Sequence, residues 1–388
     1  MTNGLDQRTS AGLAALHGRV LDVDANEYTP APRWGDVFGE RGARFVESAA
    51  MLLAMAGDLN VDAADGVEIS EDTVWTSKGP EAPGAVDLNR RPAVLDAMGI
   101  RRQLVYPTMG LLATLQALGG LGWPLSDEAR SAAWDAMDAV NDWSAERTSR
   151  CPERVRFVAF LKSMTPDATA KSLTAQAERL IGAGARAVLI PTGVPPAGLS
   201  PAAEALDPFY ELLATSDVTL VAHPPSALGY TNDAWLGVDP IGLGASHAPV
   251  ENFLRMMTLG GVFERHPALR FGAIKSGAGW VGPLAEFMDF VVDGQRAPMA
   301  LTGTSSRLSL KPSEYLARNV RVTPYNFEPV DVCFQRYPQL QDVFCYSSHY
   351  PDPTGGEWSL RRFHDMVAPL GAGIVEKFFC TNAELLLP

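Results

Sequence analysis

Short apolar runs alternate with longer segments of helical pattern along most of the chain. The runs are rich in Val, Ile, Leu and Phe, as expected for strands that are buried on both faces of a parallel sheet. We predict strands at residues 20–24, 103–107, 155–161, 187–191, 218–223, 269–275 and 343–347, with another at 320–323 or close to Ala245. Helices are predicted between them, for example at residues 131–148, 168–181 and 251–265.

About eight strands in alternation with helices favour a closed (β/α)8 TIM barrel of the α/β class over an open doubly wound sheet. No GxGxxG motif follows the first strand, which argues against dinucleotide binding. The 388 residues suit one barrel domain, residues 1–388. Residues 28–89 do not fit a βα unit, and we predict that they form a lid inserted after the first strand. The segments 226–250 and 296–313 are predicted to be long functional or disordered loops.

The charge balance narrows the possible partners. The formal net charge is −13 and no Lys and Arg cluster occurs, which argues against binding to nucleic acid or to an anionic membrane surface. The four cysteines form no CxxC pair, so neither a zinc ribbon nor a disulfide framework is expected. No segment has the pattern of a secretory signal or of a membrane span. We therefore predict a soluble cytoplasmic protein.

Histidines stand where strands are predicted to end. His223 ends the run 218–223, and His349 follows the apolar run 343–346 with Asp352 three residues later. His247 lies in a loop just before a predicted helix. Because the carboxyl ends of barrel strands meet at one mouth, we expect these side chains to lie close together. A metal site is one interpretation, and an ordinary strand end with a proline turn is the other.

The first strand carries oxygen-bearing side chains at alternate positions. Asp22, Asp24 and Asn26 share one face, and burying them in an apolar strand is costly without a counter-charge, which a bound cation would supply. In the alternative interpretation Asp24 and Asn26 cap the following loop. Lys275 ends another strand and is expected to pair with an Asp, hold an anionic substrate group or act as an acid. Lys162 stands similarly, and we expect it to reach water.

Several motifs together resemble the amidohydrolase-2 branch of the metal-dependent hydrolases, the group of aminocarboxymuconate semialdehyde decarboxylase and related nonoxidative decarboxylases. They lie at residues 21–24, 221–224, 246–249, 261–265, 276–280, 376–379 and 381–382. The resemblance implies an amidohydrolase-like barrel with a metal site at its mouth.

The family pattern is altered at the site itself. The family usually has a histidine where Asn26 stands, and Ser-Asp-Tyr-Pro-His where residues 348–352 read Ser-His-Tyr-Pro-Asp. An acidic residue is common where Lys275 stands. The ligand set that the resemblance implies is mixed and holds enough groups for two ions: Asp24, Asn26, Glu27, His223, His247 and His349, and possibly Asp352. Imidazole and carboxylate ligands suit iron, manganese or zinc.

This altered pattern resembles the TIM-barrel nonheme diiron monooxygenase of platensimycin and platencin biosynthesis. That resemblance implies two iron ions, an external electron donor, and O2-dependent hydroxylation of an apolar, CoA-linked, diterpenoid-type substrate by a homodimer, with Lys275 and Asp352 as catalytic residues. The first alternative is a zinc- or manganese-dependent hydrolase or nonoxidative decarboxylase. The second is a barrel kept as a binding or scaffold protein without metal.

Overall fold

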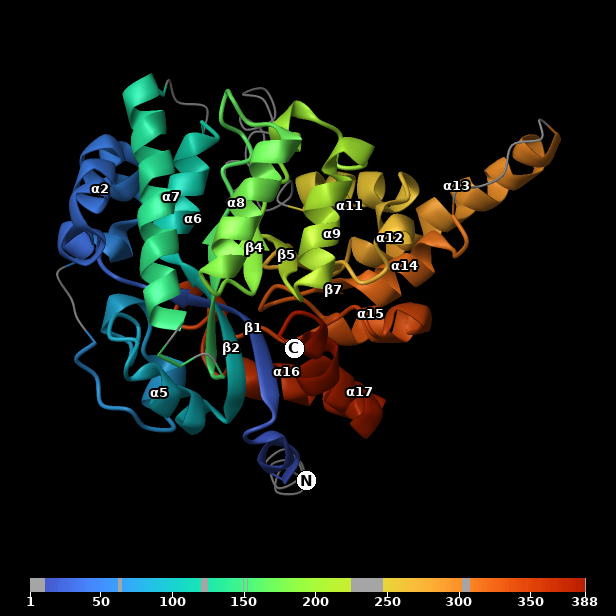
Figure 1. Cartoon of the computed structure of the whole chain (residues 1–388). Helices are drawn as coiled ribbons and strands as arrows, with labels where there is room; N and C mark the ends of the chain where they lie inside the picture. Colours follow the sequence, from blue (N-terminus) through green and yellow to red (C-terminus); the bar gives the residue numbers. More distant parts are fainter. Residues whose placement is uncertain are drawn as a thin grey trace.

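Seven parallel strands form one curled sheet in which each strand pairs with the next along the chain (Figure 1). The computed structural model describes residues 11–61, 65–119, 125–148, 150–151, 153–224, 247–301 and 308–387. The strands are β1 (Val20–Glu27), β2 (Ile100–Pro107), β3 (Val155–Phe160), β4 (Ala187–Leu189), β5 (Thr219–Ala222), β6 (Arg270–Ala273) and β7 (Val320–Val322). Their residues are almost all buried, as the continuous apolar runs predict.

Residues 343–350, called the closing segment below, close the ring between β7 and β1. Phe344 bridges to Val322 and Tyr350 to Ala25, both in parallel orientation. The backbone N–H of His349 donates to the carbonyl of Asp24 at 2.9 Å. The prediction of a TIM-barrel fold is therefore confirmed, although the predicted strand 343–347 makes single bridges instead of a regular strand. The predicted strand 320–323 corresponds to β7, and the alternative near Ala245 lies outside the described residues.

Helices cover the outside of the sheet (Figure 1). Their bounds are α2 (Trp34–Ser48), α3 (Ala50–Met55), α4 (Thr73–Thr76), α5 (Arg91–Met98), α6 (Thr108–Ala117), α7 (Asp127–Thr148), α8 (Ala170–Gly182), α9 (Asp207–Thr215), α11 (Ala248–Leu259), α12 (Val262–Arg265), α13 (Val281–Leu301), α14 (Pro312–Asn319), α15 (Val330–Arg336), α16 (Ser359–Val367) and α17 (Ala372–Glu376). In α8 a capping box at Thr169 starts the helix, and Leu173, Ala177 and Leu180 form its buried stripe. The predicted helix 251–265 is two helices, because Gly261 adopts a φ of +77° between α11 and α12.

The C-terminal segment, residues 382–387, covers the amino-terminal end of the barrel. The guanidinium of Arg102 donates to the carbonyl of Leu387 at 3.0 Å, and the hydroxyl of Thr219 donates to that of Leu386 at 3.3 Å. Arg321 donates to the carbonyl of Asn382 at 2.8 Å. These three donors stand near the starts of β2, β5 and β7. The opposite end, where the strands finish, is therefore the one that presents side chains to a substrate.

The inserted segment 28–89 is largely helical and has two parts. Helix α2 packs beside α7, with the rings of Phe38 and Trp143 5.4 Å apart (Figure 1). The later part borders the turn after the closing segment, since the N–H of Gly79 donates to the carbonyl of Pro351 at 2.9 Å. The hydroxyl of Tyr350 also donates to the carbonyl of Pro83. The segment thus reaches the mouth, and its action as a lid stays a prediction.

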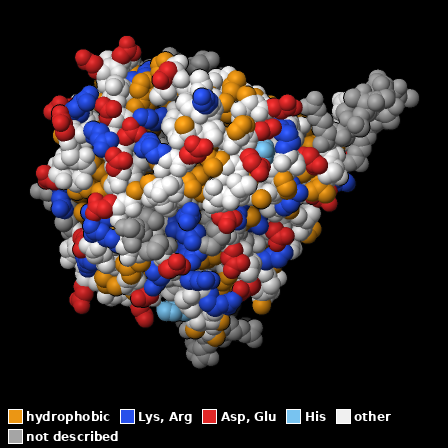
Figure 2. Space-filling model, viewed as in Figure 1, with side chains coloured by type: hydrophobic (Ala, Val, Ile, Leu, Met, Phe, Trp, Pro, Cys, Tyr) orange, Lys and Arg blue, Asp and Glu red, His pale blue; other side chains and the backbone are white. Residues whose placement is uncertain are grey.

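The surface agrees with the mixed charge of the sequence. On the face that Figure 2 shows, acidic and basic side chains are interspersed. In the part of the chain that the structure describes, no helix is long and apolar enough to cross a membrane. All four cysteines are free thiols. Of the two predicted long loops, residues 225–246 and 302–307 lie outside the described residues, and α13 continues to Leu301.

Candidate functional site

Asp24 is the centre of a buried polar cluster at the barrel mouth. Its side chain is fully buried in β1. One carboxylate oxygen lies 3.2 Å from Nδ1 of His349, and the other lies 3.7 Å from Nε2 of His223. Burial alone would raise the pKa of Asp24, but His349, His223 and Lys275 hold it below its ordinary value. The carboxylate is therefore charged between two imidazoles.

His349 is held in a strained conformation at the end of the closing segment. Its φ is +56°, a left-handed value that costs a residue other than glycine about 1–3 kcal/mol unless its surroundings enforce it. Its Nε2 lies 3.2 Å from the hydroxyl oxygen of Ser347. Burial lowers the pKa of His349 to about 4, and the nearby Asp24 opposes this only in part. At neutral pH the imidazole is uncharged.

Lys275 and Asp352 form an ion pair beside these groups. Nζ of Lys275 lies 3.1 Å from Oδ2 of Asp352, and the two side chains are 17% and 18% exposed. The other oxygen of Asp352 accepts from the N–H of Thr354 at 2.7 Å. Burial acts to raise the pKa of Asp352, but Lys275 outweighs it and the pKa falls to about 2. Burial acts to lower the pKa of Lys275, but Asp352 and Asp24 raise it. Both groups are charged, so Lys275 pairs with an Asp as one prediction held.

A second layer beneath the cluster fixes the closing segment. Oxygens of Asp22 accept from the N–H of Ser348 at 2.9 Å and from the amide of Gln103 at 2.7 Å. The buried Arg91 donates to the side chain of Gln103 at 2.9 Å and to the carbonyl of Asn26 at 2.8 Å. Burial raises the pKa of Asp22 to about 6 despite these hydrogen bonds. Asp22 therefore positions the residue that precedes His349.

Two residues near the cluster were missed by the sequence analysis. The ring of Tyr106, at the end of β2, lies 4.9 Å from that of His223, and burial raises its pKa well above the ordinary value. Burial lowers the pKa of Lys78 to about 8, and the carboxylate of Asp352 opposes this shift. Tyr106 had a usable signal, since it stands with Pro107 at a predicted strand end. Lys78 had none, because the insertion follows no repeating pattern.

Two residues of the predicted ligand set bind other groups. Oε1 of Glu27 accepts from the N–H of Thr29 at 2.5 Å, so Glu27 is the side chain that caps the following loop. Nε2 of His247 lies 3.7 Å from a carboxylate oxygen of Glu251, and its ring stacks on Trp280 with centroids 6.3 Å apart. The amide nitrogen of Asn26 donates to the carbonyl of Tyr106 at 3.3 Å, and its amide oxygen is buried without a hydrogen-bond partner.

The cluster offers oxygen and nitrogen donors but no metal-ligand group as the side chains stand. The carboxylate oxygens of Asp24 and the amide oxygen of Asn26 are buried without hydrogen-bond partners, a setting that calls for positive charge. Yet within the described ranges no three His, Cys, Asp or Glu side chains are placed to hold a metal ion. His349 and His223, and after them Lys275, lower the pKa of Asp24. Imidazole and carboxylate donors of this kind suit a divalent metal, although the side chains are not placed as a ligand set in the described part of the chain, and the ligand roles expected from sequence stay predictions.

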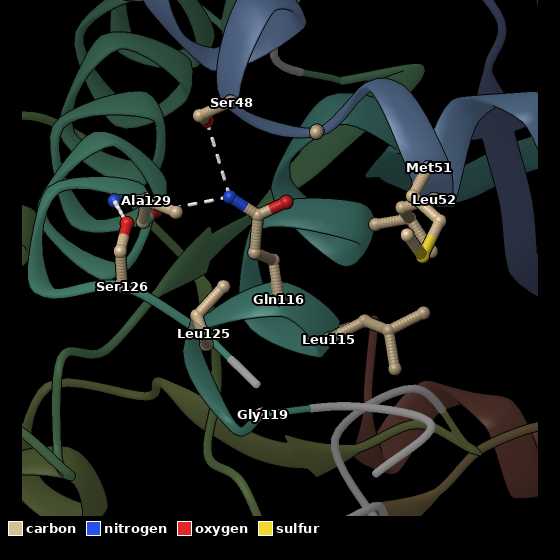
Figure 3. A pocket seen from close by; sticks show the side chains of 10 residues that line it. Ser48, Met51, Leu52, Leu115, Gln116, Gly119, Leu125, Ser126 and Ala129 are labelled. Atoms are coloured by element: carbon tan, nitrogen blue, oxygen red, sulfur yellow. Dashed lines mark hydrogen bonds between the residues drawn. The ribbon is translucent and has the colours of Figure 1, made fainter. Parts of the chain in front are cut away.

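A separate cavity of about 410 Å³ lies between α2, α3, α6 and α7 (Figure 3). Its lining is mainly apolar and includes Met51, Leu52, Leu115 and Leu125. The amide nitrogen of Gln116, its main polar group, already donates to Ser48 at 3.1 Å and to the carbonyl of Ala129 at 2.9 Å. No residue of the Asp24 cluster lines this cavity, so the chemistry belongs to the barrel mouth.

A family model described as amidohydrolase matches residues 111–388. No curated protein matches the chain.

Three solved structures show the same fold over almost their whole length. An amidohydrolase from Mycobacterium avium subsp. paratuberculosis is 19% identical, with a TM-score of 0.65 over 95% of this chain and 99% of that one. The 5-carboxyvanillate decarboxylase of Novosphingobium aromaticivorans, with bound manganese, is 20% identical, with a TM-score of 0.59 over 95% and 96%. A dihydroxybenzoic acid decarboxylase from Polaromonas sp. JS666, also with manganese, is 15% identical, with a TM-score of 0.58 over 95% and 97%.

The prediction of a diiron monooxygenase is wrong. The three solved structures above are an amidohydrolase and two decarboxylases with bound manganese, and none of these three is described as an oxygenase. The prediction rested on His349, which was interpreted as an altered iron ligand. In the structure that imidazole faces Asp24, and the ammonium of Lys275 lies beside Asp352. Three predictions that depended on it lose their basis: the oxidoreductase class, the two iron ions and the CoA-linked natural-product substrate.

Proposed function

Because the chain belongs to the amidohydrolase family, we propose that it is a nonoxidative decarboxylase of a small, hydroxylated aromatic carboxylic acid. The family match covers most of the chain, and several solved neighbours act on acids of this kind, as 5-carboxyvanillate and dihydroxybenzoate decarboxylases. The alternative that the sequence analysis kept open, a hydrolase or nonoxidative decarboxylase, is thus preferred to oxygen chemistry.

The observation that carries the proposal is the pair of lysines around Asp352. Lys275 comes from the barrel and Lys78 from the insertion, and the pKa of each responds to the Asp352 carboxylate. A carboxylate that enters the mouth finds two ammonium groups there, with Asp352 as the internal anion that it competes against. Cations at the point of binding select anionic substrates. An amide substrate has no need of them.

Decarboxylation requires a proton and no oxidant. A proton adds to the ring carbon that bears the carboxylate, and the bond to that carboxylate then breaks. Its electron pair returns to the ring and CO2 leaves, so that R–COO⁻ and H⁺ give R–H and CO2. We assign the proton transfer to His349 with Asp24 as its partner. The neutral imidazole takes up a proton from solvent during turnover and passes it to the ring carbon, and the 3.2 Å contact with Asp24 keeps the ring oriented.

The test is an anaerobic assay on a panel of hydroxybenzoic acids, with released CO2 and the decarboxylated arene both measured. We expect stoichiometric CO2 without any oxygen uptake, and a loss of at least about a hundredfold in kcat/KM in His349→Gln, the usual scale for removing a proton-transfer group. Lys162→Gln is the matched control, because Lys162 also follows a strand end and pairs with an aspartate, Asp138, at 2.6 Å. Oxygen consumption, or CO2 release that His349→Gln leaves unchanged, would contradict the proposal.

Hydrolysis is the second candidate, and the neutral state of His349 favours it. An imidazole with a lowered pKa is uncharged at neutral pH and can accept a proton from water. The same panel extended with amides and esters of these acids distinguishes the two reactions. A hydrolase releases an amine or an alcohol and no CO2.

A further inference from the structure

The cavity between α2, α3, α6 and α7 is a second place where the structure leaves room for a ligand (Figure 3). Its volume is about 410 Å³. Protein interiors are close-packed, so helices that leave such a space between them give up contacts with one another. A cavity of about 150 Å³ is large enough to hold benzene. This one therefore has room for a molecule of roughly two fused rings.

The walls of this cavity carry no charge. None of the described residues that line it is Asp, Glu, Lys, Arg or His, and the side chains of Met51, Leu52, Leu115 and Leu125 make it mainly apolar. Moving a charged group from water into such surroundings is costly unless a partner compensates for it. The cavity therefore disfavours an anion such as the substrate proposed for the barrel mouth, and it suits an uncharged molecule.

The amide oxygen of Gln116 is a hydrogen-bond acceptor that the protein leaves unused. Gln116 is 7% exposed, and its amide nitrogen donates to the hydroxyl of Ser48 at 3.1 Å and to the carbonyl of Ala129 at 2.9 Å. These two bonds turn the amide oxygen to the other side, toward Met51 and Leu52 (Figure 3). Among the described residues no donor reaches that oxygen. Buried carbonyl oxygens ordinarily have a partner, so this one is available to a ligand in the cavity.

From these observations we propose that the cavity binds a small, uncharged, apolar molecule that carries a hydroxyl group, such as a phenol. The rings of the ligand pack among the leucine and methionine side chains, and its O–H donates to the amide oxygen of Gln116. Met51 is 61% exposed, so one wall of the cavity lies next to solvent, from which the ligand enters. Apolar burial supplies the affinity and one placed polar group supplies the selectivity, as in small-molecule sites generally. The site does not depend on the proposed function.

The experiment titrates the whole protein by calorimetry with probes that share one ring system. 2-Naphthol has a hydroxyl, 2-methoxynaphthalene has a methyl group in place of the hydroxyl hydrogen, and 2-naphthoate is an anion. We expect 2-naphthol to bind roughly threefold to tenfold more tightly than the methyl ether, the scale of one net hydrogen bond. Gln116→Met keeps the length of the side chain without the amide, and it should bind these two probes alike. Because both probes are measured on both proteins, an effect of probe size cancels.

Filling the cavity shows where the probe binds. Ala129 lines the cavity from α7, and Ala129→Phe should weaken the binding of 2-naphthol by roughly tenfold or more, because the added ring takes the space of the ligand. Ala175→Phe is the matched control, since it adds the same ring at an exposed position of α8, and it should change nothing. Circular dichroism checks that each variant folds. If Ala129→Phe does not fold, Leu115→Trp fills the cavity from α6 instead.

Several results would overturn the proposal. The site is refuted if the natural protein does not bind 2-naphthol, or if the folded cavity-filling variant binds it as tightly as Ala175→Phe does. The role of Gln116 is refuted if the natural protein does not prefer 2-naphthol, or if Gln116→Met keeps the preference. The ligand class is refuted if the cavity-filling variant abolishes binding of 2-naphthoate. A missing decarboxylase activity would change none of these results, so the two proposals fail separately.

Discussion

At the scale of single residues, the exchange of acid and base in the segment 348–352 is matched by new partners. His349 faces the carboxylate of Asp24 at 3.2 Å, and Asp352 faces the ammonium of Lys275 at 3.1 Å. Each exchanged residue is therefore paired with a group of complementary character. The altered motif rearranges proton and charge partners at the mouth, which a sequence comparison alone interprets as a change of metal ligands.

Lys78 yields a prediction about pH. Its pKa of about 8, lowered by burial, means that its ammonium is present below that pH and lost as the pH rises through it. For an anionic substrate, kcat/KM should therefore fall above about pH 8. Lys78→Arg keeps its charge, so its alkaline limb should move upward, whereas Lys78→Gln should be slower throughout and lack that limb. Steady-state kinetics across this range decide it, and an unmoved limb in Lys78→Arg would refute the role of Lys78.

The sequence identified several residues that meet at the barrel mouth for a physical reason. His223, Lys275 and His349 end apolar runs, and the carboxyl ends of barrel strands converge, so their proximity followed from the fold. Glu27 falls on the other parity of β1 from Asp22, Asp24 and Asn26 and one of its oxygens accepts from Thr29, so its ligand role stays a prediction. His247 belongs to the turn before α11, where Glu251 and Trp280 are its neighbours, and its ligand role also stays a prediction.

At the scale of elements, the hydrophobic pattern predicted the buried strands but did not predict how the last apolar run pairs with its neighbours. Runs such as 155–161 and 218–223 correspond to β3 and β5, because both faces of these strands are covered. The run 343–347 is equally apolar but makes only bridges, since its residues bend to pair with both β7 and β1. The helices of residues 28–89 were not predicted, because this segment packs α2 on α7 and its later part on the mouth.

The C-terminal segment yields a prediction about stability. The amide of Asn382 donates to the carbonyls of Gln341 and Phe344 at 2.8 and 2.7 Å, and its side chain is buried. Asn382→Ala leaves both carbonyls without a partner and should lower the free energy of unfolding by roughly 2 kcal/mol or more. Lys377→Ala, which removes an exposed pair with Asp342, should cost less than about 0.5 kcal/mol. Urea unfolding of both variants checks this, and equal losses would contradict it.

At the scale of the whole molecule, the two ends of the barrel have different tasks. The C-terminal segment fills the amino-terminal end through Arg102, Thr219 and Arg321, whereas the mouth collects charged groups from β1, β6, the closing segment and the insertion. Stability and chemistry are thus separated along the barrel axis, as barrel enzymes in general arrange them. The homodimer, the lid motion and the cytoplasmic location stay predictions.

The measurement that tests the central claim most directly is the fate of the proton during turnover. The protein is incubated without oxygen in D2O with a hydroxybenzoic acid that it converts. The account predicts CO2 and an arene that carries one deuterium per molecule at the carbon that lost the carboxylate, with His349→Gln slowing this incorporation. A product that carries oxygen at that carbon, or turnover that stops without O2, would contradict it.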